Sequence, residues 1–136
     1  MPKIFTSEKQ KVGEIGENVA VTFLVKQGFR VLDRNYTKKW GEIDIVAQKD
    51  NNLYFIEVKS VSRENLDIVS EKMGDGYRAE DNMHPWKMQR FARTIQTYLL
   101  DKDVDDDIDW QVDLLVVYLD LKNNKSKVKV VSDIIL

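Results

Sequence analysis

The chain has 136 residues, of which 43% are hydrophobic and 32% charged, and its formal net charge is −2. Such a composition is that of one ordinary globular domain over residues 1–136, large enough for a single core. The absence of cysteine and the lone His84 exclude disulfides, zinc knuckles, thiol nucleophiles and histidine-rich metal sites, so any metal must be held mainly by oxygen.

The first predicted element is an amphipathic helix from about Ser7 to Gly28. Its apolar residues recur at helical spacing, Ser7 is a plausible N-cap, and Gly28 is a plausible stop. Residues 29–36 alternate weakly between apolar and polar and predict a first strand. A basic turn over residues 37–41 follows this strand.

The next predicted element is a hairpin of two strands, residues 41–46 and 53–59. The turn over residues 49–52 favours a register in which paired residue numbers sum to 101. Asp44 then lies opposite Glu57, and such like charges destabilise each other unless a cation lies between them. A slipped register would turn both acids to solvent. It is disfavoured by four apolar residues that would share the opposite face: Ile43, Ile45, Ile56 and Val58.

The rest of the chain predicts a loop, a helix and two strands. Residues 60–83 are expected to form a long polar loop, of a kind that is usually functional or mobile. Pro85 begins a second helix, which ends near Asp101 and packs on the sheet. The apolar run 112–119 predicts a central strand covered on both faces, and residues 128–136 predict a final edge strand.

The predicted fold class is α/β, with a mixed central sheet flanked by helices and the order α-β-β-β-α-β-β. The second helix would form a right-handed crossover, so the strands on either side of it should be parallel. No apolar run approaches the roughly 20 residues that span a bilayer, and the N-terminus lacks the apolar stretch of a signal peptide. We therefore expect a cytoplasmic protein with no membrane partner.

The hairpin acids and the lysine beside them favour metal-dependent hydrolysis of phosphodiester bonds. Asp44 and Glu57 can hold a divalent cation through oxygen, with the backbone carbonyl of Val58 as a further ligand, which suits Mg²⁺ or Mn²⁺. Lys59 shares the face of Glu57 and is placed to position or deprotonate a water, or to neutralise a phosphate. A cross-strand ion pair between Lys59 and Glu42 is the structural alternative.

Glu17 is a fourth acidic candidate, from the first predicted helix. It falls at the border of the apolar face, and the small Gly13 and Gly16 would let this helix approach a strand closely. Glu17 would then reach the metal directly or through water. The alternative is a solvated helix residue with no part in the site.

A local basic face is compatible with the net charge of −2, because residues 1–40 carry eight lysines and arginines against four acids. The candidates for a nucleic-acid contact are Arg34, Lys38, Lys39, Trp40 and Lys87. A solvated turn with one packed tryptophan, and a plain surface lysine at position 87, are the alternatives. The aspartates of residues 101–113 would repel phosphate, so we expect them away from any groove that binds it.

Five segments in this order resemble a known family. They are Gly13-x-x-Gly16-Glu17-x-x-Ala20-x-x-Phe23-Leu24, Gly28-Phe29, Arg34-Asn35-Tyr36, Gly41-Glu42-Ile43-Asp44-Ile45-Val46 and Phe55-Ile56-Glu57-Val58-Lys59. The set resembles the YraN-like uncharacterised proteins, which look like a branch of the PD-(D/E)XK nuclease superfamily and are similar in layout to archaeal Holliday-junction resolvases. The sequence departs from the family after the lysine, where Ser60-Val61-Ser62-Arg63 replaces the usual Thr-Arg.

The resemblance implies a restriction-endonuclease-like core in which Asp44, Glu57 and Lys59 form the superfamily triad and Glu17 is an accessory acid. We therefore expect an endodeoxyribonuclease that depends on Mg²⁺ or Mn²⁺, with branched or otherwise unusual DNA among its substrates. A junction needs two related cuts, which would suit a homodimer. The alternative is a nucleic-acid-binding or assembly module that keeps the nuclease fold without turnover.

Overall fold

The computed structural model of the protein describes residues 8–62 and 85–136, which form an α/β fold. The elements of these ranges follow one another as α1 (Glu8–Lys26), β1 (Arg30–Lys38), β2 (Gly41–Lys49), β3 (Asn52–Ser62), α3 (Pro85–Asp101), β4 (Asp109–Asp120) and β5 (Lys125–Val131). The predicted α/β class is thus confirmed. Neither helix in these ranges is long and apolar enough to cross a bilayer.

The five strands form one mixed sheet in the order β1-β2-β3-β4-β5. Strands β3 and β4 are parallel, as expected from the helix between them, and the other neighbours are antiparallel. The predicted strand 112–119 lies within β4, which is an interior strand but not the middle one, because β3 takes that place. The final strand is at the sheet edge as predicted, but it begins at Lys125 and ends at Val131.

The predicted hairpin register is confirmed over the turn-proximal half of β2 and β3. Pairs run from Lys49 with Asn52 to Ile45 with Ile56, and each pair of numbers sums to 101. The connection is tight because Asp50 adopts a left-handed φ of 55°, which aspartate tolerates better than most residues.

The predicted boundary of the loop after β3 is wrong. Residues 60–62 belong to β3, where their backbone continues the parallel pairing with β4. Each residue of β3 as far as Ser62 has a backbone partner on β4. The strand therefore continues through Ser60 and Ser62 although both residues are polar. The remainder of the predicted loop and His84 lie outside the described residues.

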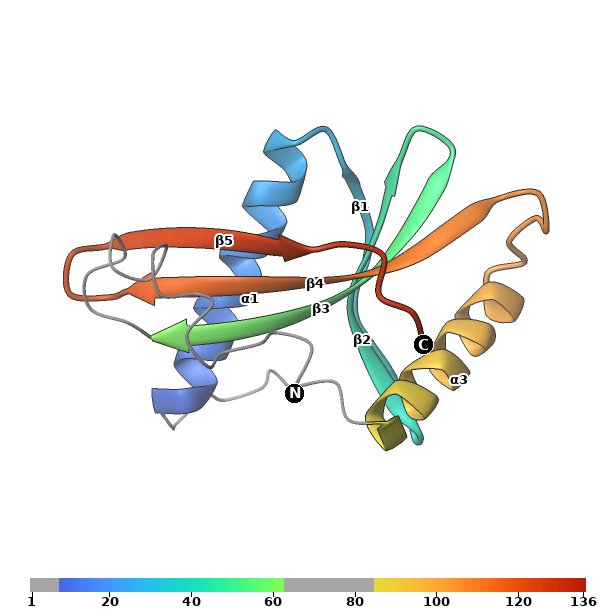
Figure 1. Ribbon diagram of the computed structural model, residues 1–136, viewed down its shortest axis with the longest axis horizontal. Coiled ribbons are helices and arrows are strands. Elements are labelled where there is room, and N and C mark those ends of the chain that lie inside the picture. Colours follow the sequence, from blue (N-terminus) through green and yellow to red (C-terminus); the bar gives the residue numbers. More distant parts are fainter. Residues whose placement is uncertain (1–7, 63–84) are drawn as a thin grey trace.

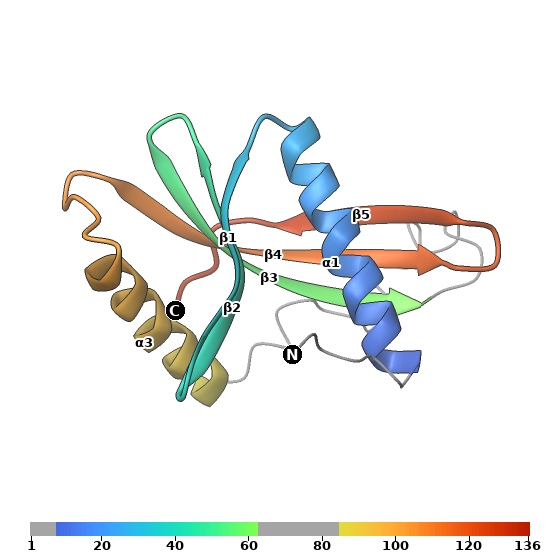
Figure 2. The ribbon, with the colours of Figure 1, turned by 180° about the vertical axis from the view of Figure 1, so that it is seen from behind.

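The two helices cover opposite faces of the sheet (Figures 1 and 2). Helix α1 lies along β3 and β4, whereas α3 packs against β2. Neighbouring residues of β3 divide between the two faces, as expected for a strand. Ile56 packs with Ala20 of α1, while Phe55 packs with Phe91 and Ile95 of α3.

A kink in β1 moves one residue of β2 to an unexpected face. Asn35 has a left-handed φ of 53°, and the pairs on either side of it are Arg34 with Ile45 and Tyr36 with Ile43. Ile45 packs in the core under α1, but Ile43 and Tyr36 pack in the core under α3. The prediction that Ile43 and Ile45 share a face is therefore wrong, because the alternation of side chains breaks here. Asp44 lies between the two cores.

One of the two predicted glycines allows α1 to approach the sheet. A Cβ placed on Gly16 would collide with the side chain of Ser60 on β3, so only glycine fits at this crossing. A Cβ on Gly13 would meet nothing within 4 Å. The prediction for Gly16 is confirmed, and the same prediction for Gly13 is wrong.

We expect opposite effects on stability from Gly16→Ala and Gly13→Ala. Overpacking against Ser60 should cost Gly16→Ala about 1–3 kcal/mol. Gly13→Ala should gain up to about 1 kcal/mol, because alanine is the better helix former and has open space. Urea unfolding measures both values. Ser60→Gly should restore part of the loss in the Gly16→Ala background, and equal shifts in the two single variants would contradict the assigned packing.

Candidate functional site

The site begins where β2 separates from β3. The backbone pairs between these strands end at Ile45 and Ile56, one step before Asp44 and Glu57 in the same register. Asp44 Oδ2 instead accepts a hydrogen bond of 2.8 Å from the backbone N–H of Val58. The carboxylate therefore replaces the backbone of β2 as the hydrogen-bond acceptor at this edge of β3. Beyond this point β3 pairs with β4 alone, as far as Ser62.

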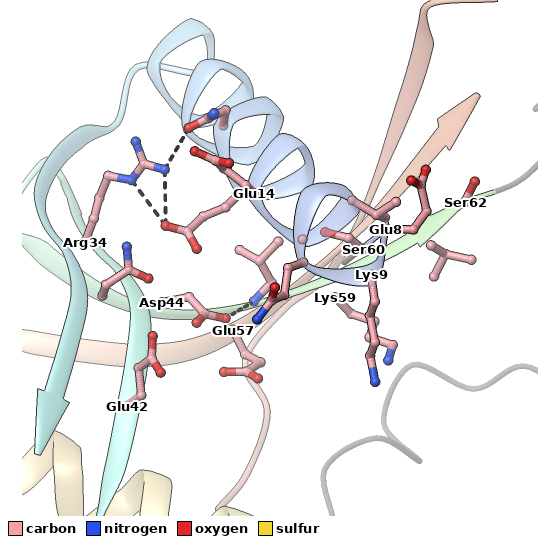
Figure 3. A pocket seen from close by; sticks show the side chains of 18 of the residues that line it. Glu8, Lys9, Glu14, Arg34, Glu42, Asp44, Glu57, Lys59, Ser60 and Ser62 are labelled. Atoms are coloured by element: carbon pink, nitrogen blue, oxygen red, sulfur yellow. Dashed lines mark hydrogen bonds and ion pairs between the residues drawn. The ribbon is translucent and has the colours of Figure 1, made fainter. Parts of the chain in front are cut away.

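A cleft of about 1340 Å³ opens at this fork. Its walls come from α1 and from strands β1, β2 and β3, and Lys87 of α3 closes one side. Figure 3 shows Asp44 and Glu57 lying together at its base, below the N-terminal half of α1. The four predicted catalytic residues, Glu17, Asp44, Glu57 and Lys59, all line the cleft.

The pKa of Asp44 is strongly shifted by its surroundings. Burial and then the charge of Glu57 raise its pKa from the ordinary 3.8 to about 8. The charges of Glu42 and Glu17 add to the rise, and the Val58 N–H opposes it. The pair of acids thus holds a proton or a cation more readily than two isolated carboxylates would.

Lys87 supplies a cation to this pair. Its amine donates a hydrogen bond of 2.8 Å to Glu57 Oε1, and the side chain of Glu57 is only 16% exposed. Lys87 comes from the first turn of α3, on the side of the sheet opposite α1. The residue predicted as a phosphate contact therefore lies in the site itself, in contact with a carboxylate.

Glu17 is held by Arg34 on the other side of the cleft. Arg34 Nη2 lies 3.1 Å from Glu17 Oε1 and donates a second hydrogen bond of 2.9 Å to Asn18 Oδ1. The kink at Asn35 makes this contact possible, because it leaves Arg34 on the α1 face of β1. Glu17 is therefore not a solvated helix residue, and Arg34 is directed at α1.

Lys59 lines the cleft but contacts neither acid of the fork. In Figure 3 it is seen beyond Glu57, toward the start of α1, whereas Glu42 is seen on the other side of the acid pair. The alternative ion pair between Lys59 and Glu42 does not form, since the ion pairs within the described ranges join Arg34 to Glu17 and Lys87 to Glu57.

Lys38, Lys39 and Trp40 lie around a second, smaller cavity of about 380 Å³. This cavity shares Asp44 and Glu57 with the large cleft, so the acid pair lies at the junction of the two. None of the aspartates of residues 101–113 lines either cavity. Their predicted separation from the groove agrees with this arrangement.

The oxygen atoms at the fork fit a hard divalent cation. Asp44 and Glu57 are adjacent carboxylates, and Mg²⁺ usually keeps several waters beside one or two such ligands. In the part of the chain that the structure describes, no cluster of three acidic, histidine or cysteine side chains could hold a metal ion. A cation would thus depend on the acid pair with backbone and water, and it would share Glu57 with Lys87.

Sequence reasoning missed three residues that shape the site. Asn18 orients Arg34, and its only signal was its place beside Glu17. Thr37 lines both cavities without any distinctive pattern. Arg90 lines the small cavity, and its spacing of three residues from Lys87 in a predicted helix could have placed it there.

Comparison with known proteins identifies a family. Residues 16–117 match the model of the Uncharacterised protein family UPF0102. The chain is 36% identical over 119 residues to a UPF0102 protein of Campylobacter fetus subsp. fetus, covering 88% of each chain. It is 34% identical over 119 residues to a UPF0102 protein of Flavobacterium psychrophilum, covering 88% of this chain and 90% of the relative.

We expect the metal-free protein to lose stability as the pH rises from about 4 to about 8. With its pKa raised to about 8, Asp44 keeps a proton in the folded protein that the unfolded chain has released, so higher pH favours unfolding. Asp44→Asn has no such proton. The Tm of wild type minus that of Asp44→Asn, measured in EDTA, should therefore fall by several degrees over this range.

Two further variants test the cause of this pH dependence. Glu57→Gln removes the neighbouring charge that raises the pKa of Asp44 most. The decline of stability with pH should therefore end at a lower pH in this variant than in wild type. Glu42→Gln is the matched control, because its charge contributes less, and it should move the curve less. A Tm difference that does not change with pH would show that the carboxyl of Asp44 is not perturbed.

Proposed function

The chain belongs to the uncharacterised protein family UPF0102, the YraN-like group, and we propose that it is a metal-dependent endonuclease that hydrolyses DNA phosphodiester bonds. The observation that carries the proposal is the pair Asp44 and Glu57, which meets at a strand fork inside a cleft of about 1340 Å³. Two adjacent acids destabilise a fold unless they hold a proton or a cation. Their place in a large open cleft favours a catalytic use.

The arrangement of the elements supports the same proposal. A helix, a three-strand meander, a helix and two more strands is the layout of a restriction-endonuclease-like core, to which we assign this chain. In that assignment the acids come from the middle of β2 and β3, and Lys59 follows Glu57 by two residues on β3. The family description names no activity, so the site carries this assignment.

The residues that would hold Mg²⁺ or Mn²⁺ are Asp44, Glu57 and the backbone carbonyl of Val58, with Glu17 reaching the ion through water. A bound ion of this kind lowers the pKa of a water and offsets charge on a phosphate oxygen. The Val58 N–H fixes the carboxylate of Asp44 in one orientation before any ligand arrives. This preorganisation is the contribution of the strand fork.

The lysines of the cleft would act on the phosphate and on the attacking water. The Lys59 amine makes no ion pair or hydrogen bond to another described residue, so its charge is available to bind a phosphate oxygen or to orient the attacking water. Lys87 offsets the charge of Glu57, which lowers the repulsion that a polyanion meets at the acid pair. Arg34 stays engaged with Glu17 and Asn18 and positions that acid.

A second function, binding DNA without cutting it, is favoured by the ion pairs of the cleft. Lys87 pairs with Glu57 and Arg34 pairs with Glu17, so two of the acids of the cleft have a cation partner without a metal. The protein would then bind nucleic acid through Lys38 and Lys39, since Arg34 is held by Glu17 and Asn18. Its Tm should not rise with Mg²⁺, whereas a nuclease that binds the ion at Asp44 and Glu57 should gain stability with ion concentration.

We expect purified protein to nick end-labelled DNA in Mg²⁺ or Mn²⁺ and not in EDTA. The substrates are branched, flapped, single-stranded and blunt duplex DNA, with branched DNA cut best. Asp44→Asn, Glu57→Gln and Lys59→Met should each lower the rate by about 100-fold or more, because each removes a group that acts on the reacting phosphate or water.

Lys9→Met is the matched control for Lys59→Met. Both lysines line the cleft, but Lys9 comes from α1 and is seen away from the acid pair in Figure 3. Its removal should leave the rate within a few-fold of wild type. Equal cutting by wild type and Lys59→Met on every substrate, with or without metal, would refute the proposed activity.

A further inference from the structure

The small cavity joins the acid pair to a surface rich in arginine and tryptophan. Its lining includes Lys38 at the end of β1, Lys39 and Trp40 of the β1–β2 connection, Lys87 and Arg90 of α3, and the acids Glu42, Asp44 and Glu57. A ligand that runs from the large cleft across the acids would therefore enter a basic, aromatic cavity. We call Trp40, Trp86, Arg90 and Arg93 the arginine–tryptophan surface.

Two stacked pairs build this surface. The guanidinium of Arg90 lies 4.2 Å from the ring centroid of Trp86, and that of Arg93 lies 4.3 Å from the ring of Trp40. Trp86, Arg90 and Arg93 follow one another at spacings of four and three residues, so they share one face of α3. Trp86 is 58% exposed, which is unusual for so large an apolar side chain.

The two elements that carry the surface are packed tightly together. A Cβ on Gly41 would collide with Thr94 and would lie 3.2 Å from the carbonyl oxygen of Arg90. The β1–β2 connection is thus pressed against α3 at the level of Arg90. This contact places Trp40 under Arg93 and keeps the two stacked pairs on one rigid support.

The chemistry of the surface matches a polyanion with exposed ring faces. Stacking on tryptophan fixes the plane of each guanidinium and leaves its N–H groups for an anion. Neither arginine forms an ion pair with a carboxylate in the described ranges. The indole N–H of Trp40 is buried and has no hydrogen-bond partner among those residues, so it is a donor that an incoming acceptor could use.

We propose that the arginine–tryptophan surface binds an unpaired DNA strand that leads through the small cavity to Asp44 and Glu57. Bases stack on aromatic side chains while arginines and lysines bind the phosphates between them, which is how proteins hold single strands. A duplex keeps its base faces stacked inside and offers only phosphates to this surface. The inference rests on the proposed function and names its substrate class, DNA with an unpaired segment beside the cut.

Binding in EDTA tests the inference apart from any cutting. Fluorescence anisotropy would compare a labelled oligothymidine with a blunt duplex of equal length at several salt concentrations. Arg90→Gln with Arg93→Gln should weaken oligothymidine binding by about tenfold. It should also reduce the salt slope by about 1.4, the value for two lost phosphate contacts. Trp86→Ala should weaken binding of the single strand but leave the salt slope nearly unchanged, because it removes a stacking surface and no positive charge.

The double variant Lys127→Gln with Lys129→Gln is the matched control, because it removes two positive charges from the edge strand β5. Neither lysine lines either cavity. An equal effect of this control and of the arginine variant would overturn the inference. Equal losses for single strand and duplex would also overturn it, as would competition by polyglutamate as strong as that by oligothymidine. Melting curves confirm that each variant is folded.

The proposed function can fail separately. One outcome is that the arginine variant loses oligothymidine binding in EDTA while wild type does not cut DNA in Mg²⁺. That result supports the role of the arginine–tryptophan surface and refutes the nuclease activity. Metal-dependent cutting by wild type, with unchanged binding in the arginine variant, refutes the surface and leaves the nuclease in place.

Discussion

The hydrogen bond from the Val58 N–H to Asp44 organises the site, because it allows β2 and β3 to part. A backbone donor at a strand edge needs an acceptor, and a buried donor without one costs about 1–3 kcal/mol. Asp44 supplies that acceptor from a side chain, so β2 can turn away while β3 continues along β4. The gap between the strands becomes the base of the cleft.

The same bond explains why a costly acid is retained at this point. A carboxyl beside Glu57 in a partly buried place is unfavourable when charged, and the fold compensates with cations from both faces. Arg34 approaches from the α1 side to hold Glu17, and Lys87 approaches from the α3 side to hold Glu57. The site is thus a meeting point of both layers. A change in either helix would alter the charge balance at the fork.

Much of this arrangement was predictable because it depends on local chemistry. The turn at residues 49–52 fixes the hairpin register, and that register brings Asp44 beside Glu57 whatever the rest of the fold does. The spacing of apolar residues likewise predicted both helices. Gly16 was predictable as a contact, since a small residue on a buried helix face indicates a close neighbour.

The rest depends on tertiary geometry that a single sequence does not reveal. The left-handed Asn35 breaks the alternation of β1 and decides which face Arg34 reaches. No periodicity signals that break, so Ile43 was assigned to the wrong face. The sequence also did not predict Glu57 as the partner of Lys87, because the two residues are thirty positions apart and meet only in the folded protein. Ser60 and Ser62 looked like loop residues, because their strand depends on pairing with β4.

The two cavities differ in their balance of acidic and cationic side chains, and this difference would orient a bound polyanion. Acids outnumber cations in the large cleft by six to four, because Glu8, Glu14 and Glu17 of α1 and Glu42 of β2 join the acid pair there. Cations outnumber acids by four to three around the small cavity, where Lys38, Lys39 and Arg90 join Lys87. A phosphate chain is therefore attracted from the side of α3 and meets rising repulsion past the fork. A cation at Asp44 and Glu57 would reduce this repulsion and would link entry of the strand to the chemistry proposed for the acids.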